Sequence, residues 1–352
     1  MTDVDHYVEL AKQSEYFSAA RISDDLDRLL ADQKETCEQL AEQCKGITSR
    51  LFLVGSGGSY ANLLTIKYLF DRLAQIPCEA VPSYELIWRR PSFLNEEALV
   101  VLASFSGETE DTVAAMHYAK ERGARTVGIV RSADSTIGRE SDLAIPYESP
   151  ACYEAPMVAL CLVLAHMAAD ETAGEEAAQL GRSLTTVPEL LRRALSAEEG
   201  RAEARAREFL HATHMYVLGA GPLSALAYKV ALSVLMENVR IGGTYCDACE
   251  FRHGPAEALE RTKPDMMFLL GTDESRPMTL RTIDFCRAQG ARVLVYDAAE
   301  FGDCHPLLTP LVMNSVVQWF VVYSAILRGV LDLDERVFMG HNVLAEGGAR
   351  WP

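Results

Sequence analysis

The stretch that decides the fold is Leu51-Phe52-Leu53-Val54-Gly55-Ser56-Gly57-Gly58-Ser59. A short apolar run that ends in glycines, followed by apolar residues at helical spacing over 61–73, is typical of a strand, a tight turn and a helix. A second apolar run, 98–103, ends in Ser104-Phe105-Ser106-Gly107 and leads into a helix predicted over 108–122. This alternation of strands and helices predicts a parallel sheet.

The same order of elements recurs in the second half of the chain. Residues 215–218 run into Gly219-Ala220-Gly221, and two further apolar runs follow at 267–270 and 292–296. In the first half a third strand is predicted at 126–130. Each of the three elements of the second half lies at a nearly constant distance along the sequence from its counterpart in the first half. Such self-similarity indicates a duplicated domain. The predicted fold class is α/β, with two tandem flavodoxin-like domains, each a parallel sheet flanked by helices.

Composition and charge narrow the class of protein. Hydrophobic side chains make up 49% of the 352 residues, which predicts a substantial buried core. The net charge of −17 opposes binding to nucleic acid or to anionic membranes. Since no signal sequence opens the chain and its nine cysteines show no disulfide framework, we expect a cytoplasmic protein. The most apolar stretches, 155–169 and 311–330, are interrupted by polar residues and are predicted to be buried helices.

The predicted organisation has five parts. A helical arm with an acidic exposed face comes first, a segment rich in alanine, glutamate and arginine joins the two halves, and a polar tail ends the chain. The predicted boundaries are 1–48 for the arm, 49–169 for the first domain, 170–212 for the connecting segment, 213–330 for the second domain and 331–352 for the tail.

The two turns of the first half favour a small anion over a dinucleotide. The first turn lacks the third glycine of the dinucleotide-binding pattern, because Tyr60 takes that position. In the second turn the hydroxyls of Ser104, Ser106 and Thr109 gather at the start of a helix, where the helix dipole favours negative charge. An ordinary helix cap would show the same pattern. Because Ser59 lies in the neighbouring turn, at the same edge of the sheet, the two turns together predict a phosphate cradle.

These two turns carry a resemblance to a known family. The run Ser104-Phe105-Ser106-Gly107-Glu108-Thr109-Glu110-Asp111-Thr112 resembles the phosphate loop of the sugar isomerase (SIS) domain family, and Gly57-Gly58-Ser59-Tyr60 resembles its first turn. In that family the loop hydroxyls bind the phosphate of a hexose 6-phosphate. The resemblance therefore implies two tandem SIS domains and a phosphate site made by Gly58, Ser59, Ser104, Ser106 and Thr109.

The second half carries a different set of polar residues. Its loop at 271–274 holds carboxylates where the first half holds hydroxyls, so we expect one phosphate site per chain. Glu237 follows an apolar helical run, which predicts partial burial and a raised pKa for a carboxylate that accepts a proton. His253 precedes Gly254-Pro255 on a predicted loop. Taken singly, such a glutamate is usually a surface residue and such a histidine is usually incidental.

The spacing of Glu237 and His253 resembles the isomerase half of glucosamine-6-phosphate synthase, and the resemblance is closer to deglycases of phosphorylated Amadori compounds. It extends over Glu250-Phe251-Arg252-His253-Gly254-Pro255 and Asp334-Glu335-Arg336. It implies that Glu237 moves a proton, that His253 acts as acid and base in ring opening or at the substrate oxygens, and that Arg336 contacts the substrate.

The resemblance implies a deglycase that converts a 6-phosphorylated ketosamine to glucose 6-phosphate and a free amine, with no metal or organic cofactor. Alternatives on the same fold are an aldose–ketose isomerase, an amino-sugar phosphate deaminase and a non-catalytic sugar-phosphate sensor. Amide transfer from glutamine is not expected, because the chain begins Met1-Thr2 and its last lysine is Lys263.

A homodimer is also expected. The glycine-containing stretch 241–250 is long enough to carry His253 away from its own subunit, and in the synthase the equivalent histidine comes from the neighbouring chain. The resemblance therefore implies two shared sites per dimer.

Two cysteines near His253 could suggest a metal. Cys246 and Cys249 form a C-x-x-C pair, but no second pair accompanies them, so we expect ordinary cysteines and no metal site. Ala248-Cys249 stands where the deglycases carry Ser-Gly, which affects the pocket for the substrate amine.

Overall fold

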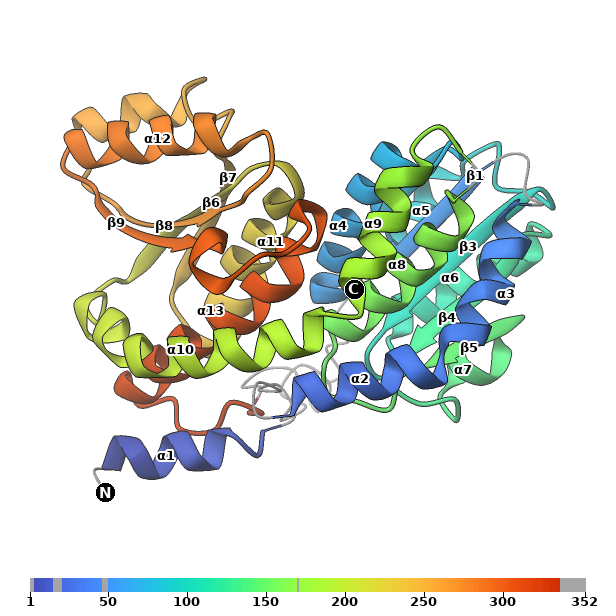
Figure 1. The fold of residues 1–352 in the computed structure, drawn as a ribbon, viewed down its shortest axis with the longest axis horizontal. Coiled ribbons are helices and arrows are strands. Elements are labelled where there is room, and N and C mark those ends of the chain that lie inside the picture. The colour runs from blue at the N-terminus through green and yellow to red at the C-terminus, as the bar shows by residue number, and fades with distance from the viewer. Residues whose placement is uncertain (1–2, 15–20, 46–49, 170, 336–352) are drawn as a thin grey trace.

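Two parallel sheets, one from each half of the chain, lie on either side of a layer of helices (Figure 1). The computed structural model describes residues 3–14, 21–45, 50–169 and 171–335. Within them, the α/β architecture with tandem parallel sheets agrees with the fold predicted from the sequence.

The first sheet has the strand order β2-β1-β3-β4-β5. Every residue of β3 is buried, because helices pack on both faces of this central strand. The strands of this sheet are β1 Arg50–Gly55, β2 Cys78–Pro82, β3 Ala98–Ser104, β4 Arg125–Val130 and β5 Leu143–Pro146.

The second sheet, with the order β7-β6-β8-β9, repeats the order of the first four strands of the chain. Its strands are β6 His214–Gly219, β7 Gly242–Asp247, β8 Asp265–Leu270 and β9 Arg292–Asp297. In each half the second strand lies on one side of the first strand and the third lies on the other. This repeated topology confirms the duplication expected from the sequence.

Strand β7 corrects one expectation. The stretch 241–250 was expected to extend away from its own subunit, but Gly242–Asp247 pairs in parallel with β6 along its whole length. The chain leaves the sheet only after Asp247. Gly242 and Gly243 open this edge strand, and Gly243 is the one buried residue in it. The strand therefore has no apolar pattern by which it could be recognised from the sequence.

Helices connect the strands and fill the space between the sheets. In the first half they are α4 Gly57–Leu73, α5 Ser83–Arg89, α6 Glu110–Glu121, α7 Thr136–Glu140 and α8 Glu154–Met167. The connecting helices are α9 Gly174–Leu184 and α10 Val187–Glu208. The second half has α11 Ser224–Lys229, a π-helical segment Val230–Val239, α12 Arg276–Ala288, α13 Thr309–Leu327 and short 3₁₀ turns at Gly221–Leu223, Pro255–Glu260, Ala298–Phe301 and Pro306–Leu308.

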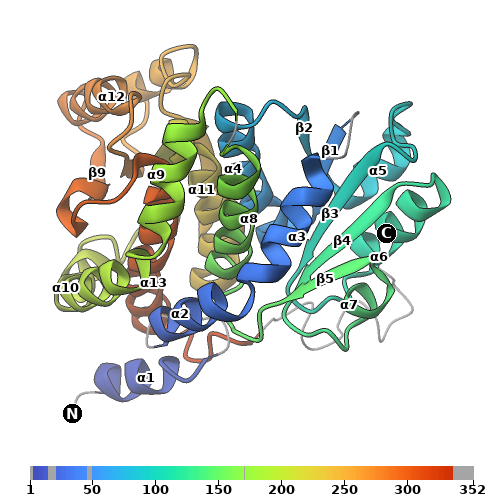
Figure 2. The same ribbon diagram turned by 45° about the vertical axis from the view of Figure 1, so that its right-hand side comes forward.

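The N-terminal arm is helical where it is described. Its helices are α1 Asp3–Ala11, α2 Ile22–Asp32 and α3 Lys34–Lys45. Helix α1 packs against α13, α2 against α10 and α8, and α3 against α8 (Figure 2). The three helices carry acidic residues on their exposed sides. Their apolar faces join the main core.

One continuous apolar core links the two halves. It contains fully buried residues from α4, α11 and α13, among them Leu63, Leu226 and Val316. Helix α4 of the first half packs directly on α11 of the second half. The two sheets are therefore tied together through their helices.

The two apolar stretches are buried helices, as predicted. Residues Pro306–Leu327 are the one segment of the described ranges that is long and apolar enough to cross a membrane. In the most apolar 18-residue window of this segment, 89% is buried inside the fold, where α13 packs along α10. Helix α8 is similarly enclosed, with even its first residue, Glu154, buried.

The continuous core predicts that the halves unfold together. Replacing Leu226, which is fully buried, by alanine leaves a cavity at the junction and should cost about 2–5 kcal/mol of stability. Denaturant unfolding followed by circular dichroism should show one transition shifted to lower denaturant. The matched change Leu280→Ala, on an exposed face of α12, should shift it little. Two separate transitions, of which only one moves, would contradict the shared core.

Candidate active site

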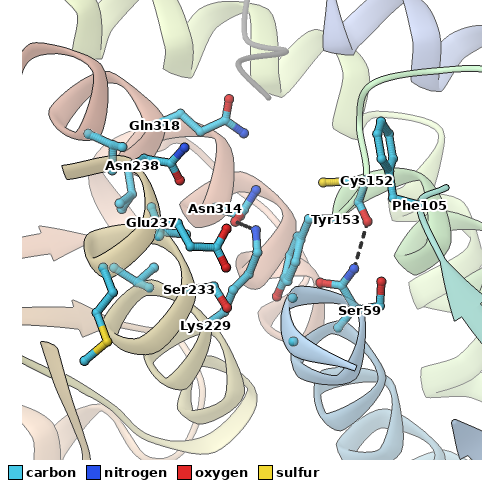
Figure 3. A pocket seen from close by; sticks show the side chains of 18 of the residues that line it. Ser59, Phe105, Cys152, Tyr153, Lys229, Ser233, Glu237, Asn238, Asn314 and Gln318 are labelled. Atoms are coloured by element: carbon cyan, nitrogen blue, oxygen red, sulfur yellow. Dashed lines mark hydrogen bonds between the residues drawn. The ribbon is translucent and has the colours of Figure 1, made fainter. Parts of the chain in front are cut away.

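A cavity of about 1060 Å³ lies between the two halves, at the carboxyl ends of β1 and β3 (Figure 3). In the first half its walls come from the start of α4, the turn after β3 and the residues before α8. In the second half they come from the end of α11, the π-helical segment and α13. A site at this edge is the usual place for ligands of parallel α/β sheets.

One end of the cavity is formed by the first glycine turn. Gly57 has φ +54°, a left-handed conformation that favours glycine, and with it the chain enters the long helix α4. The Ser56 side chain does not cap this helix, and its hydroxyl donates to the Asp111 carboxylate. Gly58 and Ser59 line the cavity at the positive end of the helix dipole. This is a suitable environment for an anion.

The second turn brings three hydroxyls together beside the first. Ser104 Oγ lies 2.8 Å from Thr109 Oγ1 and accepts the Gly107 amide at 3.0 Å. Ser106 Oγ accepts the Glu108 amide at 3.1 Å. Ser106 and Thr109 line the cavity, whereas Ser104 is only 3% exposed and lies beneath the loop. Ser104 is therefore placed to orient the turn, and Ser106 and Thr109 to meet a ligand.

The backbone at Gly107 shapes this turn, and the nearby Glu108 carboxylate is held away from the cavity. Gly107 has φ +67°, and a Cβ at this position would lie 2.1 Å from Ser135 Oγ, so only glycine fits. The Glu108 carboxylate accepts the amide and the hydroxyl of Thr136, both at 2.7 Å, and these bonds lower its pKa. Glu108 is thus held against α7 and is not among the residues that line the cavity.

The wall of the cavity that faces the cradle carries a lysine that the sequence analysis did not single out. Lys229 Nζ donates to Asn314 Oδ1 at 2.7 Å and lies 4.3 Å from the ring centre of Tyr153. The buried Glu154 carboxylate accepts Asn314 Nδ2 at 2.6 Å and the Ser315 hydroxyl at 2.7 Å. Burial lowers the pKa of Lys229.

Glu237 lies on the π-helical segment and lines the cavity, with its carboxylate pointing into it (Figure 3). The partial burial expected for this side chain was wrong, because it is exposed. The apolar residues before it divide between two faces: Leu235 is buried, and Leu232 and Met236 are exposed. The segment that carries Glu237 is π-helical, and π-helical turns are frequent at functional sites.

His253 is not brought to Glu237 within one chain. It follows β7 in an exposed turn, its Nε2 lies 3.0 Å from Arg252 Nε, and it is not among the residues that line the cavity. Arg336 lies outside the described residues. The nearby Leu333 lines the cavity, and Glu335 forms an ion pair of 2.7 Å with Arg240, so the chain passes the cavity just before Arg336.

Comparison with known proteins identifies the family. Residues 48–168 match the SIS domain family. A Bacillus subtilis protein named fructosamine deglycase FrlB is 30% identical over 291 residues, covering 79% of this chain and 88% of its own. This chain belongs to the SIS domain family. A fructoselysine 6-phosphate deglycase from Escherichia coli is 29% identical over 300 residues, covering 85% of this chain and 88% of its own.

Solved structures agree with this assignment. A Bacillus subtilis structure assigned to the phosphosugar isomerases is 27% identical and superposes with a TM-score of 0.79, covering 91% of this chain and 98% of its own. The residues of the two turns all lie inside the matched SIS range, whereas Glu237 and His253 lie beyond it.

The second half of this SIS protein has a different turn at the equivalent place. Gly221 lies in the turn that corresponds to the first glycine turn of the first half, and a Cβ at Gly221 would lie 2.6 Å from Asp273 Oδ1. Asp273 is buried and accepts the Ser275 amide at 2.9 Å. A carboxylate therefore occupies the position where the first half has its cradle, and like charge disfavours a second phosphate there.

The cysteine pair offers little for a metal. Cys246 belongs to β7 and Cys249 follows it, and burial raises the pKa of both thiols. Over the described ranges of the chain, no group of three or more histidine, cysteine, aspartate or glutamate side chains is arranged to hold a metal ion.

The cradle predicts which hydroxyl matters for phosphate. Thr109→Val keeps the shape but removes a hydroxyl that lines the cavity, so the dissociation constant of sorbitol 6-phosphate, measured by titration calorimetry, should rise roughly 10- to 150-fold. The matched change Thr262→Val removes a hydroxyl bonded to Ala258 O, outside the cavity, and should leave the constant unchanged. Equal affinity of both variants would contradict the cradle.

Proposed function

We propose that this SIS protein is a deglycase that converts a 6-phosphorylated ketosamine to glucose 6-phosphate and a free amine or amino acid. Glu237 removes a proton from C1, next to the nitrogen, and gives an enaminol. Return of a proton to C2 gives the C1 imine, which water hydrolyses. The substrate nitrogen takes part in this rearrangement, so the steps require no organic cofactor.

One observation carries the proposal: a single cavity contains both the hydroxyl-and-glycine cradle and the Glu237 carboxylate. A phosphate held between Ser59 and Thr109 would leave the rest of an extended hexose to reach across the cavity toward the second half. The names of the relatives, fructosamine deglycase and fructoselysine 6-phosphate deglycase, agree with this reading. The lining of the cavity also includes Val317, Val321 and Leu333, and its volume of about 1060 Å³ leaves room for the amine.

The proposal includes a homodimer with shared sites. His253 is exposed and does not line its own cavity, so we infer that it reaches the cavity of a second subunit. A two-fold dimer makes two such exchanges at once. There His253 would act as acid and base in ring opening of the sugar.

The activity is tested by incubating the purified chain with fructosyl-amino acid 6-phosphates and measuring glucose 6-phosphate with a coupled dehydrogenase. The proposal predicts release of glucose 6-phosphate and amine in equal amounts. Fructose 6-phosphate and glucosamine 6-phosphate are run alongside. Turnover of only one of these two would favour an isomerase or a deaminase, and binding without turnover would favour a sensor.

The proposed base predicts the behaviour of Glu237→Gln. The amide keeps the size of the side chain but cannot take a proton, so kcat should fall by about 10²- to 10⁴-fold while sorbitol 6-phosphate still binds. The control Glu121→Gln changes an exposed glutamate at the end of α6 and should keep full activity. A Glu237→Gln protein with kcat near that of the unaltered chain would exclude this residue as the base.

The shared site predicts recovery of activity by mixing. Glu237→Gln and His253→Ala proteins, each inactive, are mixed in equal amounts after reversible dissociation. Mixed dimers then contain one site with both original residues and one with neither, so about a quarter of the original activity should return. Mixing Glu237→Gln with the double variant serves as control, because no site then regains Glu237. If subunits exchange and no activity returns, the sites are not shared.

A further inference from the structure

The cavity contains a charged side chain that the proposed mechanism leaves without a role. Among the described residues, Lys229 is the lysine that lines it. The amine is partly desolvated at the end of α11, where the α-helix passes into the π-helical segment that carries Glu237. A lysine in such surroundings is costly to keep, which suggests a function.

The position of Lys229 is fixed by partners from two other parts of the chain, Asn314 on α13 and Tyr153 just before α8. Asn314 Nδ2 donates to the Glu154 carboxylate at 2.6 Å, which turns Asn314 Oδ1 toward Lys229, and Lys229 Nζ donates to that oxygen at 2.7 Å. The ring of Tyr153 lies against the ammonium at 4.3 Å, a cation–π distance. These contacts use part of the donor capacity of an ammonium, which has three hydrogens.

The same side chain connects the two ends of the proposed site. A Cβ on Gly58, in the cradle, would lie 3.8 Å from Lys229 Cε, so the side chain passes the phosphate end. Its amine continues past the cradle to Asn314, and in Figure 3 it points into the same part of the cavity as the Glu237 carboxylate. Glu237 also acts electrostatically on Lys229. An acid and a base thus face one region of the cavity.

The proposed reaction needs an acid at this place. When a proton leaves C1 of a ketosamine, negative charge develops on the C2 oxygen, and a positioned cation next to that oxygen lowers the barrier. We propose that Lys229 is a catalytic residue of the deglycase reaction, which donates a proton to the C2 oxygen while Glu237 removes the proton from C1; this role rests on the proposed function.

The proton balance of the two steps closes. In the first step the C1 proton goes to Glu237 and an ammonium proton goes to the C2 oxygen, which gives the enaminol and a neutral Lys229. In the second step Glu237 returns its proton to C2, the C1–N double bond forms, and the proton lost from nitrogen returns to Lys229. Burial lowers the pKa of Lys229, which makes this exchange easier than for an exposed lysine.

The kinetic test compares Lys229→Met with Lys263→Met. Lys263 is exposed and donates to Leu259 O, outside the cavity. The proposal predicts that Lys229→Met lowers kcat by about 10²-fold or more, with KM and the dissociation constant of sorbitol 6-phosphate changed only a few-fold, and that Lys263→Met changes neither. A weaker affinity at unchanged kcat would assign Lys229 to the phosphate and overturn the proposal, as would an unchanged kcat with unchanged affinity.

A labelling experiment on the unaltered chain tests the placement without relying on a variant that folds. Pyridoxal 5′-phosphate, which carries an aldehyde and a phosphate, is added and the imine is reduced with borohydride. Mass spectrometry of peptides should find the label on Lys229, and sorbitol 6-phosphate should prevent it. Label confined to other lysines would overturn the placement.

The two proposals fail in different ways. An unaltered chain that releases no glucose 6-phosphate from any ketosamine phosphate would overturn the proposed function and the role of Lys229 with it. An active chain whose Lys229→Met variant is equally active would overturn the role of Lys229 alone.

Discussion

The packing of α4 on α11 is the contact on which the cavity depends. Each helix follows the first strand of its half, so the duplicated topology brings equivalent helices together. Leu63 and Leu226 are fully buried in the core they share, and Tyr60 and Tyr228 meet edge to face at 6.3 Å. This contact brings the cradle at the start of α4 opposite Lys229 at the end of α11. If the helices separated, the two groups of residues would lie on different surfaces.

The two halves have the same topology but different chemistry. In the first half, positive-φ glycines and hydroxyls leave a polar space that favours an anion. In the second half, the Asp273 carboxylate fills the equivalent turn, and the side chains proposed to act on the substrate, Lys229 and Glu237, lie instead on the helical segments that follow it. A long π-helical segment, ending at Arg240 in a left-handed conformation, presents Glu237 to the cavity. The cavity is therefore lined by hydroxyl and glycine residues from the first half and by Lys229 and Glu237 from the second.

Features that depend on neighbouring residues in the sequence were predictable. The central strands are continuous apolar runs, and the cradle turn is encoded between Ser104 and Thr109. The edge strands β2, β5 and β7 were missed because they are short and only partly buried. The contacts of Lys229 could not be predicted either, because Asn314 lies 85 positions from Lys229 and 160 positions from Glu154. Residues this far apart in sequence become neighbours only through the packing of complete helices.

The account rests on one claim: a sugar phosphate lies across the junction, with its phosphate at the first half and its reacting carbons at the second. A crystal structure with sorbitol 6-phosphate, an open-chain compound without a carbonyl, tests this directly. The account predicts the phosphate between Gly58–Ser59 and Ser106–Thr109, and C1 and C2 within hydrogen-bonding reach of Glu237 and Lys229. A phosphate bound at the opposite end, near Arg240, would contradict it.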